Sequence, residues 1–350
     1  MSRSWGRQDA ATIVAAIVLI WLMPLLISTY TLTVLVIYGM LALSLGLIWG
    51  FGGILCFGQA AFFGLGAYTY AIAAINVGES TLPMILAVFV PALFAALLGA
   101  MMFYGRLTDV YLGVITLVVT LILFKFVNSS AGPQYVIGEA RLGGFNGIPG
   151  FHTLNIPGQP DEYIWGDALY YVCAVALLAV YFLVTWLLRS SFGRIAIGIR
   201  ENESRVSLMG YDVRARKTIL FAIGAAIAGL AGALFANWGE IVTPGLFSLG
   251  QSAEIIIWCI VGGLGAHHRR RRSRLSEIPA GSAVPDRQYI DHGHHPCALR
   301  AVFAERHRSG RRISLESKLW PQVGPKIRKA SAYAQGGQCQ WLKPCWRQQV

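Results

Sequence analysis

Apolar stretches of about 20 residues recur along the first three quarters of the chain. A helix that crosses a hydrocarbon core of about 30 Å must bond its backbone polar groups internally, which takes roughly 20 mostly apolar residues. Eight segments fit this pattern, the last being short, and they cover 11–28, 31–49, 56–75, 82–104, 110–127, 168–188, 218–238 and 252–265. The sequence therefore predicts an all-α polytopic membrane protein in a lipid bilayer, with about eight transmembrane segments.

The excess positive charge is confined to the end of the chain. The formal net charge is +12, but residues 1–266 hold 12 Lys and Arg against 12 Asp and Glu, so residues 267–350 carry the whole excess. The chain is 55% hydrophobic and 13% charged, whereas a soluble domain has about 45–50% and 25%. We therefore expect a transmembrane domain over 1–266, a separate basic tail over 267–350, and no nucleic-acid partner.

The tail, 267–350, has neither helical nor strand periodicity. Of its 17 basic residues 13 are Arg, mixed with Ser, Pro and Gly, a composition typical of GC-rich DNA translated out of frame. We interpret the tail as frameshifted or disordered, with a genuine cytoplasmic extension as the alternative. A metal-binding module is disfavoured, so His292, His294 and His295 receive no metal assignment.

Basic residues orient the apolar part, because short loops rich in Lys and Arg stay in the cytoplasm. Arg106 and the seven basic residues of the connection 189–217 fall inside when the N-terminus is cytoplasmic. The connection 128–167, rich in Gly and Pro, then lies outside and is expected to form turns and a short hairpin. Arg3 and Arg7 precede the first stretch as in a signal peptide, but without a small-residue cleavage site we expect a retained span.

No catalytic signature is visible in the apolar part. A Walker A loop, GxxxxGK[ST], does not occur, since Lys217 and Thr218 follow Arg216 rather than a glycine loop. His152 has no paired nucleophile, and the cysteines have no ligand-like spacing. We therefore expect no enzymatic activity, no metal site and no cofactor bound by this chain.

A glycine-rich stretch, residues 50–70, interrupts the apolar field (GFGGILCFGQAAFFGLGAYTY). Glycine lets helices break or approach closely, and a broken helix in a membrane is tolerated where it lines protein or a cavity. We predict broken helices here, with candidate pathway side chains Gln59, Phe62, Phe63 and Tyr68. Tight packing, with Gln59 bonded to a neighbouring helix, is an equally good interpretation.

The inner connection, residues 189–217, has an apolar side and a charged side. Charged residues such as Arg194 and Arg200 form one side, and the apolar side consists of Ile195, Ile197, Ile199, Val206, Leu208 and Met209. This pattern predicts a short amphipathic helix at the membrane surface. A plain positive-inside loop would explain the Arg residues alone, but the length of the connection and its mixture of acids and bases favour a docking surface for a soluble partner.

Small residues recur at helical spacing in 218–238, which predicts a close seam between helices. They are Gly224, Ala225, Ala228, Gly229, Gly232 and Ala236. Two charges in apolar stretches, Lys125 and Glu254, are expected to reach the membrane interface rather than to move ions.

Collinear motifs along 58–266 resemble the permease subunits of ABC importers for branched-chain amino acids, and their sister permeases for urea and short amides. The motifs are GQAAFFGLGAYTYA at 58–71, GVITLVV at 113–119, GGFNGIPG at 143–150, SFGRIAIGIRENESRVSLMGYDV at 191–213, KTILFAIGAAIAGLAGALFA at 217–236 and GGLGA at 262–266. The resemblance implies a multi-pass permease of a bacterial inner membrane. The chain departs from it after Ala266, where a family member would continue with Gly-rich apolar sequence and a further span.

In such permeases the inner connection is the coupling segment that docks on the ATPase. The resemblance places this role on Gly193, Arg194, Arg200, Glu201, Asn202, Glu203 and Gly210. It also implies a second permease subunit, two cytoplasmic ATPase subunits that use ATP and Mg, and an extracytoplasmic solute-binding protein as partners.

Two other classes of function fit the hydropathy. A secondary transporter driven by an ion gradient would need acids or bases near a helix centre, where the sequence indicates none. A structural scaffold would need neither a glycine-rich interruption nor a long docking loop. The solute stays open between a branched-chain amino acid, urea and a short amide, because selection can occur at the binding protein.

The abrupt change after Gly265 generates a prediction about the gene. The four Arg residues at 269–272 would continue the eighth stretch into hydrocarbon, where each Arg costs roughly 2.5–3.5 kcal/mol. We expect the DNA beyond this point, read in a shifted frame, to encode a Gly-rich apolar segment and another membrane helix. Resequencing tests this, and the interpretation is wrong if the present frame is confirmed and neither other frame contains an apolar run of about 20 residues.

Overall fold

The structure is a computed structural model that describes residues 18, 20–132, 134–151, 153–156, 159–164 and 166–262, except for the side chains of 156 and 159–162. All of these residues belong to the first of two units, Met1–Pro279. Most of the first predicted span, His152 and the tail 267–350 lie outside the described residues.

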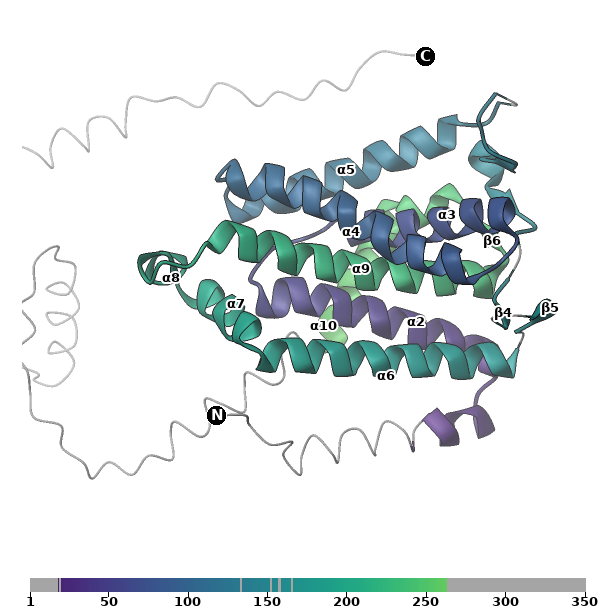
Figure 1. The fold of residues 1–350 in the computed structure, drawn as a ribbon, viewed down its shortest axis with the longest axis horizontal. Helices are drawn as coiled ribbons and strands as arrows, with labels where there is room; N and C mark the ends of the chain where they lie inside the picture. Colours follow the sequence, from purple (N-terminus) through teal and green to yellow (C-terminus); the bar gives the residue numbers. More distant parts are fainter. Residues whose placement is uncertain are drawn as a thin grey trace, which may run out of the picture. The chain divides into compact units, whose positions relative to one another are not determined.

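Six helices are long and apolar enough to cross a membrane, and they confirm predicted spans two to seven. They are α2 (Thr29–Leu45, continued by η2, Gly46–Phe51), α3 (Gln59–Val77), α4 (Thr81–Tyr104), α5 (Asp109–Ser129), α6 (Asp167–Arg189) and α9 (Val213–Gly239) (Figure 1). α9 begins earlier than predicted because Asp212 caps it: its Oδ1 accepts hydrogen bonds from the N–H groups of Arg214 (3.0 Å) and Ala215 (3.2 Å).

The first and last predicted spans stand apart from these six. In place of the eighth, α10 (Leu249–Val261) has 13 residues, about 20 Å of helix, which is too short to cross the hydrocarbon core. Of the first, the structure describes only the end, which closes in a 3-10 turn, η1 (Met23–Leu25). The described part therefore supports six of the eight predicted crossings.

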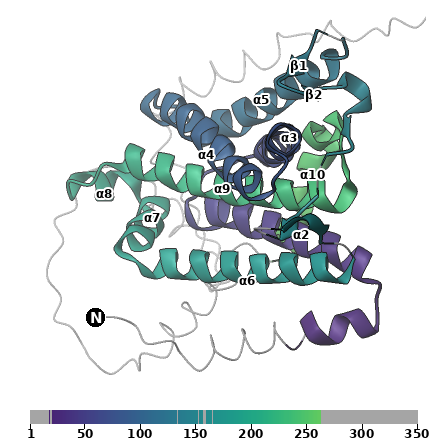
Figure 2. The same ribbon diagram turned by 45° about the vertical axis from the view of Figure 1, so that its right-hand side comes forward.

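α9 is the helix against which α2, α3 and α4 pack (Figures 1 and 2). A Cβ atom on Gly66 of α3 would overlap the backbone of Gly229, and one on Gly232 would overlap the Phe63 carbonyl. Helices in lipid gain no hydrophobic free energy by associating, so this close packing has to stabilise the contact. The predicted seam is confirmed, since all its small residues in 218–238 are buried.

The glycine-rich stretch breaks the helical pattern, as predicted. α2 ends in the wider, π-helical turns of η2, residues 52–58 have no regular helix or strand, and α3 begins only at Gln59. Ser44 and Gln59 bond to each other across this break, with Gln59 Nε2 lying 2.5 Å from Ser44 Oγ. The two helix ends are therefore joined by side chains rather than by continuous helix.

A second irregular segment leads into α10. After α9 the chain forms β6 (Ile241–Val242) and the 3-10 turn η4 (Pro244–Phe247). The Phe247 ring lies against Gly64 of α3, and its centroid is 5.5 Å from that of Tyr68. α10 therefore starts beside the middle of α3, inside the bundle rather than at its end.

The outer connection, residues 128–167, forms short hairpins, as predicted. Strand β1 (Val136–Ile137) pairs with β2 (Ala140–Arg141), and β4 (Asn155–Ile156) pairs with β5 (Gln159–Tyr163), both antiparallel. Strand β3 (Ile148–Pro149), which follows the turn η3 (Gly144–Asn146), pairs with β6. Asn155 also accepts a hydrogen bond from the Ser80 N–H (3.0 Å), which fastens the connection to the turn between α3 and α4.

The inner connection contains two helices, α7 (Ser191–Glu201) and α8 (Glu203–Leu208), instead of the single amphipathic helix predicted. Asn202 separates them, because its extended backbone leaves α7 while its Oδ1 accepts a hydrogen bond from the Arg205 N–H (3.0 Å) and caps α8. Both helices lie at the end of the bundle opposite the outer hairpins (Figure 1).

These two ends of the bundle generate a topological prediction. Phe145 of the outer connection is 78% exposed, and Ser204 of α8 is also exposed. In a variant whose natural cysteines are replaced, we expect Phe145→Cys to react with an impermeant maleimide added to intact cells, and Ser204→Cys to react only after the membrane is opened. The reverse labelling pattern would overturn the orientation.

Candidate functional site

The inner connection is shaped by hydrogen bonds that its sequence encodes. Ser190 caps α7 by accepting a hydrogen bond from the Gly193 N–H (3.3 Å), as Asn202 and Asp212 do for α8 and α9. Short polar side chains are favoured there because they satisfy the free N–H groups of a helix start. Position 193 also requires glycine, because a Cβ atom there would overlap the backbone at the end of α6.

A small apolar core holds α7, α8 and the start of α9 together. Its buried members are Ile199, Val206 and Val213, with Ile195 packed against them. Leu208 and Met209 do not join this core and remain 88% and 75% exposed. The end of α8 therefore presents apolar side chains to the surroundings of the bundle.

Arg200 connects α7 of the inner connection to the glycine-rich stretch 50–70. Its Nη1 donates a hydrogen bond to the Gly50 carbonyl oxygen in η2. A Cβ atom on Gly53 would lie 2.9 Å from the Arg200 side chain, so the side chain occupies space that glycine leaves open. A displacement of α7 would therefore act directly on the irregular stretch ahead of α3.

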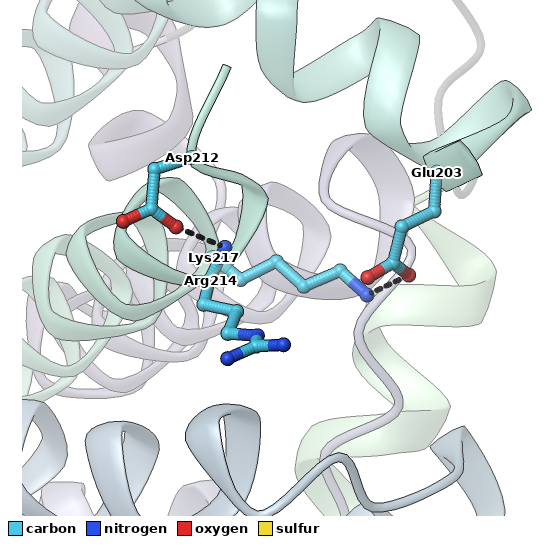
Figure 3. A network of polar contacts seen from close by, with 4 residues as sticks. All are labelled: Glu203, Asp212, Arg214 and Lys217. Carbon is cyan, nitrogen blue, oxygen red and sulfur yellow. Dashed lines mark hydrogen bonds and ion pairs between the residues drawn. The ribbon is translucent and has the colours of Figure 1, made fainter. Parts of the chain in front are cut away.

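Glu203 and Lys217 form an ion pair between α8 and α9 (Figure 3). Lys217 Nζ lies 2.7 Å from Glu203 Oε2, and the Lys217 side chain is only 14% exposed. The pair borders a hollow of about 440 Å³, whose other lining residues are Phe103, Arg106, Leu107, Thr108, Asp109 and Arg214. The Arg214 guanidinium lies over the Tyr104 ring, 5.8 Å from its centroid. The hollow therefore combines charges of both signs between the α4–α5 turn and α8–α9.

The remaining predicted coupling residues lie on the surface of the same connection. Arg194, Glu201 and Asn202 are exposed, and the Arg194 guanidinium bonds to Ser191 Oγ in its own helix (3.3 Å). Gly210 has a left-handed backbone (φ 83°), which turns the chain between α8 and α9. The docking role of these residues stays a prediction.

The exposed pair Leu208 and Met209 was missed by sequence reasoning. Both were assigned to the apolar side of the predicted amphipathic helix, because hydrophobic periodicity does not show where a helix stops. Leu208 is the last residue of α8 and Met209 follows it, and neither side chain lies on the face that packs. The signal that could have located them is Gly210, a residue typical of the turn after a helix.

The predicted pathway residues are buried inside this chain, at most 4% exposed: Gln59, Phe62, Phe63 and Tyr68. The hydrogen bond from Gln59 to Ser44 continues to α9, because Ser44 Oγ donates to the Gly224 carbonyl oxygen (2.6 Å). Phe62 packs edge-on against Phe221, and Phe63 against Phe235. These contacts fit the packing interpretation within one chain, and a pathway along the four side chains stays a prediction.

The two charges in apolar segments differ in depth. Lys125 is exposed near the outer end of α5, as expected for a side chain that reaches the interface. Glu254 is placed differently: its Oε2 accepts a hydrogen bond from the Tyr38 hydroxyl (3.2 Å), and Tyr38 lies near the middle of the span Thr29–Phe51. The expectation that Glu254 reaches the interface is therefore corrected, because α10 starts inside the bundle.

Comparisons with known proteins agree with the sequence motifs. The family model described as branched-chain amino acid transport system / permease component matches residues 27–281. No solved structure gives a significant match. The match covers all the span-length helices that the structure describes.

Curated relatives carry the same description. The high-affinity branched-chain amino acid transport system permease protein LivM of Escherichia coli is 30% identical over 282 residues, which are 73% of this chain and 63% of the relative. Its Salmonella typhimurium counterpart is 30% identical over 257 residues, 67% and 58%. A probable branched-chain amino acid transport permease protein LivM of Methanocaldococcus jannaschii is 27% identical over 252 residues, 61% and 68%. The chain thus spans less than two thirds of the length of the first two relatives.

The ion pair between α8 and α9 generates a prediction about local stability. Such pairs contribute about 0.2–1 kcal/mol, so Glu203→Lys or Lys217→Glu alone should raise amide hydrogen exchange in α8 by up to about fivefold. The swapped variant, Glu203→Lys with Lys217→Glu, restores opposite charges and should return exchange toward the wild-type rate. Exchange that stays at the wild-type rate in both single variants would show that the ion pair does not stabilise the contact between α8 and α9.

Proposed function

Since the chain belongs to the family of branched-chain amino acid transport permeases, we propose that it is the membrane-spanning subunit of an ATP-driven ABC importer. Its solute is a branched-chain amino acid, in keeping with the names of its relatives. The chain lies in a bacterial inner membrane with its N-terminus in the cytoplasm. It binds no cofactor itself, because ATP and Mg are used by separate subunits.

The proposed importer has three kinds of partner. A second permease subunit completes the translocation path, two cytoplasmic ATPase subunits drive it, and an extracytoplasmic solute-binding protein delivers the solute. The two ends of the bundle suit this division: hairpins of the outer connection are available to the binding protein, and α7 and α8 to an ATPase.

The observation that carries the proposal is the link from Arg200 to Gly50. Through it, the connection that would contact an ATPase also holds the break between α2 and α3. A partner that moves α7 would shift the chain ahead of Gln59, whose hydrogen bonds run on to α2 and α9. This would give an ATPase a mechanical route to the centre of the bundle.

We assign the docking contact to the end of α8. Leu208 and Met209 expose apolar surface on a connection whose other exposed side chains, apart from Tyr211, are charged or polar. Burying such side chains in a partner groove yields roughly 25 cal/mol for each Å² of apolar surface removed from water. The surrounding charges, with Glu203 and Lys217 already paired, would orient the encounter.

A urea or short-amide importer is the nearest alternative, and an ion-coupled secondary transporter is the more distant one. Glu254 at mid-depth is the kind of group that ion coupling uses, so the sequence-based argument against this class does not hold. Family membership and the Arg200 link favour ATP as the driving force. Uptake that requires ATP hydrolysis and persists with a protonophore would separate the two classes.

The docking assignment predicts the effect of removing the apolar pair. In the complete importer, Leu208→Ser with Met209→Ser should reduce solute-stimulated ATP hydrolysis at least about tenfold, because central apolar contacts dominate interface energies. Arg200→Ala should leave ATPase binding intact and lower the stimulation, because only the link to Gly50 is lost.

The matched control is Phe145→Ser, which removes an equally exposed apolar side chain at the other end of the bundle. It should leave ATPase binding and the unstimulated rate of ATP hydrolysis unchanged. Normal copurification and normal stimulation in the Leu208 and Met209 double variant would show that the ATPase docks elsewhere.

A further inference from the structure

One exposed helix face carries a carboxylate inside the membrane. On α10, Leu249, Ile257 and Ile260 are 50%, 59% and 53% exposed, and Glu254 is exposed between them. The exposed stripes in the middle of α4, α5 and α6 consist of apolar side chains instead. A charge near the bilayer centre is costly unless it faces protein or a water-filled cavity. We therefore expect the α10 face to meet protein or water rather than lipid.

Tyr38 of α2 contacts this carboxylate and two further side chains of α10. Gln251 Nε2 donates a hydrogen bond to Tyr38 Oη (2.9 Å), and Tyr38 Oη donates one to Glu254 Oε2 (3.2 Å). The Trp258 ring stacks on the Tyr38 ring, with 6.1 Å between centroids. These contacts fix the direction of the Tyr38 hydroxyl, which donates its one hydrogen bond to Glu254.

The depth of this group follows from α2. Tyr38 is the tenth residue of a 23-residue span, about 14 Å along the helix, so Glu254 lies close to the middle of the hydrocarbon core. In the part of the chain that the structure describes, Glu254 Oε1 accepts no hydrogen bond. One carboxylate oxygen is thus positioned by protein, and the other is free for a ligand.

We propose that Glu254 binds the primary ammonium group of the transported solute halfway across the membrane. The proposal rests on the function proposed above and deepens it. A carboxylate in a low-dielectric setting attracts an ammonium group strongly and offsets the cost of bringing that charge into the membrane. Urea and short amides are neutral and gain nothing comparable, so this residue favours amino acids among the solutes left open by the sequence.

The test uses the full chain with its permease, ATPase and binding-protein partners in proteoliposomes, and L-leucine as the probe. Glu254→Gln should lower the maximal uptake rate at least about tenfold, because a charge-assisted hydrogen bond is lost. The KM should stay within about twofold, since the binding protein captures the solute. Glu79→Gln, the same change in the exposed turn after α3, should transport like wild type.

A second measurement reports contact rather than structure. A hydrophobic carbodiimide should modify Glu254 in the wild-type complex and leave the Glu254→Gln variant unmodified. L-leucine should slow this modification, and urea should not. Tyr38→Phe removes the hydroxyl that positions the carboxylate, so it should weaken the protection by L-leucine while leaving Glu254 reactive.

The outcomes separate the two proposals. A wild-type complex without ATP-driven L-leucine uptake would contradict the importer function itself. Normal uptake in Glu254→Gln, or no protection by L-leucine, would overturn only the Glu254 assignment. Loss of the second permease from the purified variant would reassign the carboxylate to a subunit contact. Wild-type uptake that collapses with a protonophore would reassign it to ion coupling.

Discussion

Backbone contact between α3 and α9 at Gly66 and Gly229 is the constraint on which the rest of the structure depends. Two helices in lipid gain no hydrophobic free energy by meeting, so their association relies on close packing and on bonds between them. Glycine on both sides allows this approach, and α2 and α4 complete the packing around α9. A side chain at Gly66 or at Gly232 would push α3 and α9 apart, and one at Gly229 would meet the Ala87 carbonyl of α4.

This seam links the two ends of the molecule. At one end α9 begins at the Asp212 cap, directly after the connection formed by α7 and α8. At the other end it leads through β6 and η4 into α10, whose start lies beside the middle of α3. Arg200 adds a second route, from α7 to the break ahead of α3. Under the proposed coupling, movement of the inner connection would reach Gln59 along both routes.

Much of the fold was predictable from particular residues. Runs of apolar residues located the span-length helices, and the spacing of Gly224, Gly229 and Gly232 predicted the seam. The candidate site was predicted less well. Leu208 and Met209 have the hydrophobicity of buried residues, but they are the last residue of α8 and the one after it, and both are exposed. Glu254 was assigned to the interface because periodicity gives no information on the depth at which a short helix starts.

The sequence by itself determined the class of protein, the order of the six spans that the structure describes and the family, because all of these follow from local composition and collinear motifs. Only the tertiary structure decided which distant groups meet. Arg200 and Gly50 are 150 residues apart, and Glu254 and Tyr38 are 216 apart. Such pairs depend on where irregular segments turn inside the bundle, and that is set by packing against α3 and α9 rather than by any local signal.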